Sequence, residues 1–169
     1  MTITSDNNWY VLVTRSRYEK KCEQLLIKKG FEVFLPLQKI MRQWSDRKKE
    51  VEIPLFSGYL FIRYDKSKRF DVLNTPGIAH FVRYNKQDAV ISDQHIQAIK
   101  IAIDDFVKMD IIEKQFLEGE EIVIKSGPFK GFYGKIVNHK NNRKILITVD
   151  TLGKDILIEI GKTNIEKIL

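Results

Sequence analysis

Cysteine is almost absent from this sequence, which holds one, Cys22, among 169 residues. A single thiol cannot form an intramolecular disulfide framework and is too few for a zinc site built of thiolates. Nowhere do about 18 uncharged apolar residues run together, and the opening residues MTITSDNN contain no apolar segment of the kind found in signal peptides. We therefore expect a cytoplasmic protein without a membrane segment.

Patterns of catalytic and metal-binding residues are also missing. The three histidines, His80, His95 and His139, lie in separate predicted elements and show no metal-ligand spacing. Cys22 lies on the apolar stripe of a predicted helix, which favours a packed structural thiol over a nucleophile. Phosphate-binding glycine loops, dinucleotide fingerprints, serine-hydrolase elbows and paired-carboxylate motifs do not occur. The sequence therefore predicts no enzyme, no cofactor and no metal site.

Positive charge, in contrast, is in excess. The chain has 29 Lys and Arg against 22 Asp and Glu, a net charge of +7, within an otherwise ordinary globular composition. Residues 1–107 hold 18 basic and 13 acidic side chains, and residues 108–169 hold 11 and 9. This excess favours a negatively charged partner, nucleic acid first, and most of the excess lies in the N-terminal part.

The N-terminal part alternates predicted strands and helices. Both faces of the strand 9–14 are apolar, which predicts a central strand covered on both sides. Ser16 and Glu19 have the spacing of a capping box that opens a helix, and Gly30 fits its C-terminal end. The basic stretch 42–49 indicates either a hairpin arm or a loose loop.

Beyond about residue 117 the pattern changes to strands alone. We predict an α+β protein with a first domain at residues 1–107, a linker at 108–117 and a second domain at 118–169. The second domain has five candidate strands, which predict a small barrel whose closure removes exposed sheet edges. The strands are expected at 121–125, 133–139, 144–149, 155–160 and 164–168.

The segment 118–137 combines bends, glycines and aromatic residues in one short stretch. Gly131 and Gly134 allow close backbone approach, and Phe129 and Phe132 lie among the bends as either barrel plugs or a contact ridge. In residue type and spacing the segment resembles the KOW motif, which occurs in NusG/Spt5 transcription factors and in several ribosomal proteins.

Three further segments narrow this resemblance. Residues 9–12 followed by a helix, then 54–62, then 75–82, resemble in order and spacing the N-terminal (NGN) domain of the NusG/Spt5 family. One departure is Ser57, where a proline is common. The resemblance covers residues 9–169 and implies an antiparallel four-stranded sheet flanked by helices, followed by an SH3-like all-β KOW barrel.

For function, the resemblance implies a monomeric factor that binds elongating RNA polymerase through the NGN domain. Tyr10, Phe56, Tyr59 and Phe81 could supply the apolar patch that receives the polymerase, or could equally be core residues. Related factors touch the opposite side of the polymerase cleft with a further set. In this sequence that set is Lys68, Arg69 and Phe70.

Two other surfaces follow from the same resemblance. A basic edge could contact the non-template DNA strand or be a solvated helix face. It consists of Arg15, Arg17, Lys20 and Lys21. A ridge on the KOW domain would receive a ribosomal small-subunit protein or the termination factor Rho. The ridge consists of Phe129, Phe132 and Leu152.

Within the family, the strings 54–61 and 79–84 look closer to the operon-specific antiterminators of the RfaH or UpxY kind than to a general NusG acting with Rho. In the RfaH branch the KOW domain can be a helical hairpin, an alternative that the β-branched residues of 122–124 and 145–149 make less favourable here. A ribosome-associated RNA-binding KOW protein is the alternative of a different class, which the NGN-like segments disfavour.

Overall fold

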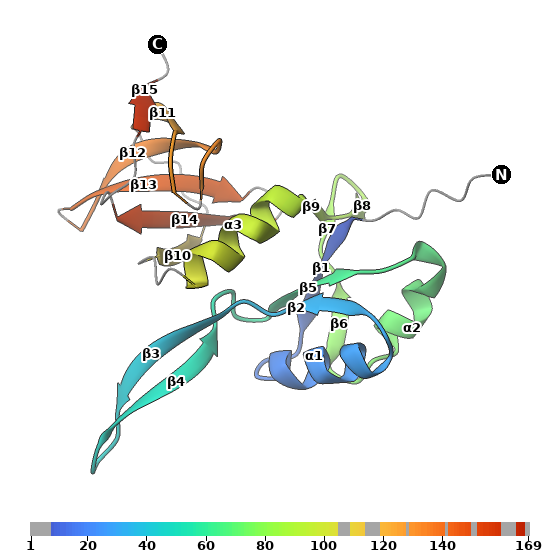
Figure 1. Ribbon diagram of the computed structural model, residues 1–169. Helices are drawn as coiled ribbons and strands as arrows, with labels where there is room; N and C mark the ends of the chain where they lie inside the picture. The colour runs from blue at the N-terminus through green and yellow to red at the C-terminus, as the bar shows by residue number, and fades with distance from the viewer. Residues whose placement is uncertain are drawn as a thin grey trace. The chain divides into compact units, whose positions relative to one another are not determined.

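The computed structural model describes residues 8–104, 109–113, 119–127, 129–140, 142–149, 152–159 and 165–167. The chain divides into two compact units, residues 1–93 and 94–169. Helices and antiparallel strands occur together, which confirms the α+β class (Figure 1).

The first unit is built on a five-stranded antiparallel sheet. Four strands were expected; the main path has four, in the order β2-β5-β1-β6, and a short additional strand, β9, also pairs with β1. Because β5 occupies one edge of β1, β6 and β9 share the other edge, each at a different end of the strand. The strands are β1 (Trp9–Thr14), β2 (Glu32–Phe34), β5 (Tyr59–Arg63), β6 (Ile78–Phe81) and β9 (Val90–Ile91).

Strand β1 is the central strand that its sequence predicts. It has hydrogen-bonded neighbours on both edges, and its alternating side chains divide between the two faces, where all but half-buried Val13 are buried. On one face Tyr10 and Leu12 join a core with Cys22 and Leu26 of α1 (Glu19–Lys28) and Val72 of α2 (Arg69–Leu73). A 3-10 turn, η1 (Lys66–Lys68), leads into α2.

The predicted capping box of α1 is wrong. The helix begins after Tyr18, whose side chain makes no capping hydrogen bond, and Glu19 is buried rather than exposed. The carboxylate of Glu19 instead accepts a hydrogen bond from the backbone N–H of Gly58, 2.8 Å away. The helix end at Gly30 is confirmed, since its φ of 85° is the left-handed conformation that glycine adopts readily.

A long hairpin extends from this unit. Strands β3 (Leu37–Gln43) and β4 (Lys48–Pro54) pair with each other as a separate two-stranded sheet, in register from Leu37 opposite Pro54 to Gln43 opposite Lys48. Of the two readings of the basic stretch, the hairpin arm is therefore confirmed. Figure 1 shows it projecting away from the five-stranded sheet as an uncovered ribbon.

The first unit ends with a smaller hairpin and an anchored residue. Strands β7 (Arg83–Tyr84) and β8 (Gln87–Asp88) form the hairpin, and Asn85 and Lys86 at its turn have positive φ. At the end of the unit, the indole N–H of Trp9 donates to the carboxylate of Asp93 at 3.0 Å, and Arg63 pairs with the same carboxylate.

The second unit contains a six-stranded antiparallel sheet in the order β10-β14-β13-β12-β11-β15. All five predicted strands occur, with ends that differ from the prediction by at most two residues: β11 (Glu120–Ile124), β12 (Tyr133–His139), β13 (Asn142–Val149), β14 (Lys154–Glu159) and β15 (Ile165–Lys167). The expected linker is in part wrong, because it contains a sixth strand, β10 (Met109–Glu113), which pairs with β14. Closure of this sheet into an SH3-like barrel stays a prediction.

Helix α3 (Asp93–Asp104) spans the boundary between the two units along the chain. Its first residue belongs to the first unit and the rest of it to the second, whereas the predicted first domain runs to residue 107. The ring of His95 contacts the ring of Phe132 within that unit, with centroids 4.7 Å apart. The NGN and KOW boundaries therefore stay predictions.

Candidate functional site

Three of the four aromatic residues expected on a polymerase-binding patch are core residues. Tyr10, Phe56 and Phe81 are 2% exposed or less, so they do not form an exposed patch, and that reading is corrected. Tyr10 lies on the central strand, where its ring packs edge-on against Tyr64 at 5.0 Å and Phe81 at 6.3 Å. Tyr59 is half-buried and is the only member of the four with accessible surface of note.

The set at the start of α2 is the one that reaches the surface. Lys68 is exposed and Phe70 is 74% exposed. Arg69, between them, is held down by an ion pair of 2.8 Å with Asp88 and by its position over the ring of Phe81, 4.5 Å from the centroid. The side chain of Arg69 is therefore held against the body of the unit, while those of its two neighbours project into solvent.

The turn that precedes β5 is positioned by a buried charge that the sequence did not reveal. Glu19 on α1 accepts the 2.8 Å hydrogen bond from Gly58, and the carbonyl of Gly58 accepts from the N–H of Thr14 on β1 at 2.8 Å. These two bonds join helix, turn and central strand, and so fix the segment from Phe56 to Tyr59. The spacing of Ser16 and Glu19 suggested a local cap, and only the fold brings Gly58 to this carboxylate.

The expected basic edge is at the surface in all its members, which are Arg15, Arg17, Lys20 and Lys21. The φ of 64° at Arg17 makes the chain turn sharply between β1 and α1. Lys21 lies over the ring of Tyr18, 5.5 Å from its centroid, and Lys20 forms a 3.8 Å ion pair with Glu52 on β4. The structure therefore links this edge to the base of the hairpin arm.

In the second unit, the expected contact ridge is not exposed. Phe129, Phe132 and Leu152 are all buried, so of the two readings given by the sequence the structural one holds for these side chains. The rings of Phe129 and Phe132 pack edge-on at 5.7 Å. Burial beside Phe132 lowers the pKa of His95, because desolvation penalises the charged imidazolium.

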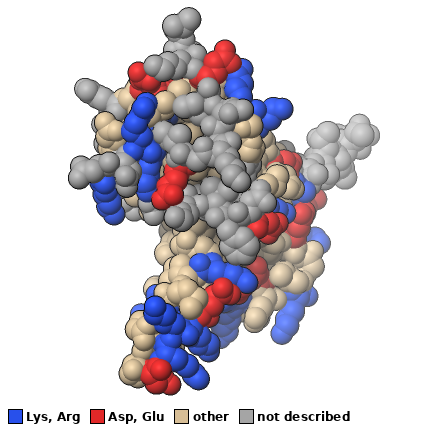
Figure 2. Space-filling view, turned by 60° about the vertical axis from the view of Figure 1, so that its left-hand side comes forward, with Lys and Arg blue, Asp and Glu red and all other residues tan. Residues whose placement is uncertain are grey.

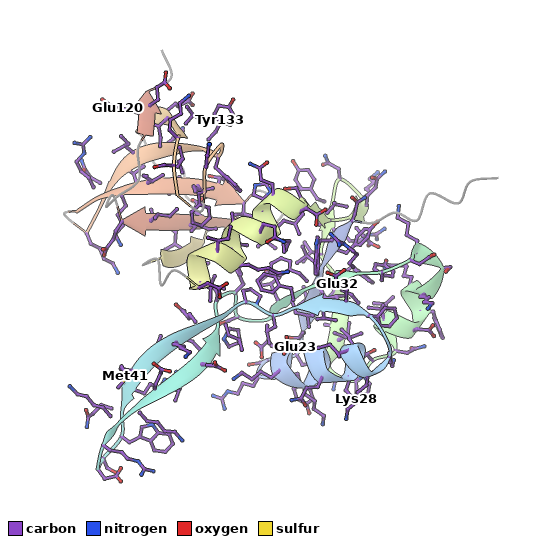
Figure 3. All side chains as sticks on the ribbon, in the orientation of Figure 1. Glu23, Lys28, Glu32, Met41, Glu120 and Tyr133 are labelled. Atoms are coloured by element: carbon purple, nitrogen blue, oxygen red, sulfur yellow. The ribbon has the colours of Figure 1, made fainter. Side chains whose placement is uncertain are left out.

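Several exposed apolar side chains are absent from the predicted sites. Tyr133 on β12 is 72% exposed and carries a polar tip, and Met41 on β3 projects from the arm (Figure 3). The exposure of Tyr133 had no clear signal, because Tyr133 is the first residue of its strand and the burial of Phe132 before it is decided by the fold. The same holds for Met41 and Trp44, whose exposure depends on the arm having no covering layer.

Metal and membrane sites have no support in the described part of the chain. No group of three or more His, Cys, Asp or Glu side chains there could hold a metal ion, and none of its helices has the length and apolarity to cross a membrane. Cys22 is buried and donates through Sγ to the carbonyl of Pro76 at 3.5 Å. Burial, and then the nearby carboxylate of Glu19, raise the pKa of the Cys22 thiol, which keeps it protonated.

Comparison with known proteins identifies the family. Residues 7–100 match the family model described as NusG, transcription termination factor nusG. The transcription termination/antitermination protein NusG of Borreliella burgdorferi is 30% identical, covering 95% of this chain and 98% of that protein. The protein of the same name from Lactococcus lactis is 27% identical, covering 98% and 96%.

Among solved structures, one described as domain interaction in Thermotoga maritima NusG superposes with a TM-score of 0.59 at 23% identity, covering 96% of this chain and 97% of that one, which supports the fold. The named relatives carry the general NusG name, so the RfaH- or UpxY-like branch that the sequence favoured gains no support from them. By the extent of the family match and the full-length relatives, the chain belongs to the NusG family.

Proposed function

We propose that this chain is a general transcription elongation and antitermination factor that binds RNA polymerase through its first unit. The observation that carries the proposal is the match to full-length NusG relatives over nearly the whole of both chains. This revises the preference drawn from the sequence, which favoured an operon-specific antiterminator and kept the general factor as its alternative. We infer no enzymatic activity, a cytoplasmic location and a monomeric state.

For the polymerase contact, the surface that the fold offers is the start of α2. Phe70 presents a large apolar ring, Lys68 adds positive charge, and Arg69 holds the segment to the core through Asp88. A rigid aromatic anchor beside a charged rim is the usual composition of an energetically important protein contact. Tyr59, half-buried at the turn fixed by Glu19, would contribute from a second place on the unit.

The second unit would recruit another protein, a ribosomal small-subunit protein or Rho. Phe129, Phe132 and Leu152 support its core as packed here. Large hydrophobic side chains that this unit exposes in its described part are Ile101 and Tyr133. We therefore propose that Tyr133 contributes to partner binding, with the three buried residues shaping the surface from beneath.

Polymerase recovery tests the first half of the proposal. The tagged chain should recover RNA polymerase from nuclease-treated lysate, because the contact is proposed to be protein to protein. Phe70→Ala should reduce recovery about tenfold, as expected for loss of a central aromatic contact. Tyr84→Ala is the matched control, since Tyr84 is also exposed on the first unit but lies at the β7–β8 hairpin. Equal recovery with Phe70→Ala and the wild type would contradict the assignment, and retention of ribosomal RNA without polymerase would favour the ribosome-associated alternative.

Transcription in vitro tests the second half. On a template with a Rho-dependent terminator, a general factor acting with Rho should increase the fraction of terminated transcripts. A specialised antiterminator should instead increase read-through, and only on templates that carry its recognition element. The fraction of terminated transcripts, compared between templates with and without that element, therefore separates the two branches of the family.

A further inference from the structure

The hairpin arm, residues 37–54, adds little to the core of the first unit. Its base is anchored by Leu37, which packs against the core, and by the N–H of Leu55, which donates to the carbonyl of Pro36 at 2.8 Å. Every residue from 41 to 50 is exposed. A two-stranded ribbon without a covering layer is marginally stable in water, so the outer half of the arm is available to a partner rather than needed for packing.

The outer half of the arm carries uncompensated positive charge. Residues 41–49 include Arg42, Arg47, Lys48 and Lys49 against one acidic residue, Asp46. The register places Arg42 directly opposite Lys49, and like charges in that position destabilise a strand pair. No acidic side chain of the described chain forms an ion pair with Arg42, Lys48 or Lys49. Figure 2 shows basic side chains gathered along this arm.

Apart from Asp46, which lies beside Arg47 at the tip, the acidic residues of the arm lie nearer its base and are engaged there. Glu50 pairs with Lys39 at 3.3 Å, and Glu52 pairs with Lys20 of α1 at 3.8 Å. Charge along the arm is therefore sorted, with compensated pairs toward the body and an unbalanced basic end. An arm selected for solubility alone would not need this arrangement, whereas an anionic partner at the tip would remove the repulsion between Arg42 and Lys49.

The turn of the arm presents an indole ring beside these charges. Trp44 is 56% exposed, and its backbone is fixed by its N–H donating to the carbonyl of Arg47 at 2.8 Å and by Gln43 Nε2 donating to its carbonyl at 3.0 Å. An aromatic ring held next to basic side chains is the combination with which proteins bind unpaired nucleic acid, the bases stacking on the ring and the phosphates meeting the charges. Base-paired duplex hides those base faces. Four basic side chains around one ring, against one acidic residue, favour a polyanionic strand over a protein surface.

We propose that the tip of the arm binds an unpaired DNA strand, with Trp44 stacked on a base and Arg42, Lys48 and Lys49 at the phosphates. DNA is chosen because an elongating RNA polymerase holds a displaced, unpaired DNA strand, so this choice rests on the proposed function. The Lys20–Glu52 pair joins the base of the arm to the α1 edge, whose basic side chains could meet the same strand. The arm then lengthens the surface available to that strand and adds a stacking contact on Trp44.

Tryptophan fluorescence of the full chain gives a direct test. The chain has two tryptophans, and Trp9 is 2% exposed, so changes on adding DNA report on Trp44. Titration with a single-stranded DNA of about 20 nucleotides should quench the emission, as base stacking on an indole does, and Trp44→Phe should remove the signal while retaining most of the affinity. Trp44→Ala should weaken binding, measured by anisotropy of the labelled strand, about tenfold.

The salt dependence of binding tests the charges separately. Each lost phosphate contact lowers the slope of log K against log salt by about 0.7 for a single strand, so the double variant Arg42→Gln, Lys49→Gln should lose about 1.4. The matched control is the double variant Lys86→Gln, Lys130→Gln, which removes two exposed charges elsewhere and should keep the wild-type slope. Trp44→Ala should leave the slope unchanged.

Three results would overturn the proposal. These are an absence of quenching, tighter binding to duplex DNA or to the corresponding RNA than to single-stranded DNA, and a slope in the Arg42 and Lys49 variant equal to that of the control. Polymerase recovery, measured beside the DNA titration, keeps the two proposals apart. If the wild-type chain recovers polymerase but DNA does not quench its emission, the arm proposal is rejected and the polymerase role is retained. If DNA quenches the emission but no polymerase is recovered, the polymerase role is rejected and the arm proposal is retained.

Discussion

At the scale of single residues, burial rather than residue type decides which side chains can act. Phe56 and Phe70 are both phenylalanines in segments that the family resemblance marked, yet one is a core residue and the other is 74% exposed. Sequence alternation could not separate them, since Phe56 lies in a turn and Phe70 in a helix too short to show a period. Glu19 is the reverse case, a charged residue that the fold buries, where its carboxylate accepts a hydrogen bond from the N–H of Gly58.

The Glu19–Gly58 bond predicts a specific loss of stability. Glu19→Ala should lower the free energy of unfolding by about 2 kcal/mol, because it removes a charge-assisted hydrogen bond and leaves the N–H of Gly58 without its acceptor. Glu19→Gln keeps an oxygen acceptor and should lose less. Urea unfolding followed by tryptophan fluorescence measures both, and hydrogen exchange at the Gly58 amide should accelerate in the alanine variant. An unchanged exchange rate would show that the bond does not protect that amide.

The lowered pKa of His95 predicts that the folded protein loses stability as the pH falls. Its folded-state pKa lies below the ordinary value of about 6.5, so below that pH the unfolded chain binds more protons than the folded one. Stability from neutral His95 is therefore complete above about pH 6.5 and is lost as the pH falls toward the folded-state pKa. The His95 imidazole resonance in NMR should titrate below pH 6.5, and His95→Gln should flatten the fall in stability between about pH 7 and 5.5. A titration midpoint above 6.5 would contradict the prediction.

At the scale of elements, the closest packing in this fold is found where a turn meets a helix. The turn that leads into β6 lies against α1: the N–H of Arg15 donates to the carbonyl of Gly77 at 2.8 Å, and Gly77 has a φ of +97°. Pro76 followed by Gly77 is a pattern typical of a turn in which the glycine is free to take positive φ. It could not predict that Tyr18 and Cys22 of α1 would occupy the space in which a Cβ would lie, because that contact is tertiary.

A pair of glycine variants separates backbone strain from crowding. A Cβ at Gly77 would lie 2.6 Å from Tyr18 Cδ1 and 2.7 Å from Cys22 Sγ, whereas one at Gly30, with φ of +85°, would meet nothing within 4 Å. Gly30→Ala should therefore cost about 1 kcal/mol, from left-handed strain alone. Gly77→Ala should cost about 3 kcal/mol, since overpacking is added to the same strain. Urea unfolding followed by tryptophan fluorescence gives both values, and equal losses would show that α1 moves aside without penalty.

At the scale of the whole molecule, the net charge of +7 is unequally divided. Residues 1–93 hold 17 basic and 11 acidic side chains, and residues 94–169 hold 12 and 11, so the first unit carries +6 and the second +1. Much of that excess lies on the α1 edge and on the outer half of the arm. Both belong to the unit proposed to bind polymerase, so charge would guide the chain to a complex that already holds DNA, and apolar contacts would fix it there.

The salt dependence of binding to an elongation complex tests this division. The double variant Arg15→Gln, Arg17→Asn should lower the salt slope by about 1.4 if both side chains meet single-strand phosphates, and asparagine is chosen because it tolerates the positive φ at Arg17. Affinity is measured at several salt concentrations against the Lys86→Gln, Lys130→Gln control. A slope equal to that of the control would show that the α1 edge is a solvated face.

The sequence by itself determined the α+β class, the central strand β1, helix α1 and its glycine end, the five strands of the second unit and the family, because these depend on local periodicity, turn residues and the order of motifs. Tertiary structure alone decided which aromatics are exposed, where the carboxylate of Glu19 bonds, that the expected linker contains β10, and that residues 37–54 form an uncovered arm. Each of these depends on a partner distant in sequence or on the absence of a covering layer. A local pattern records neither, since burial and exposure are set by what the rest of the chain places nearby.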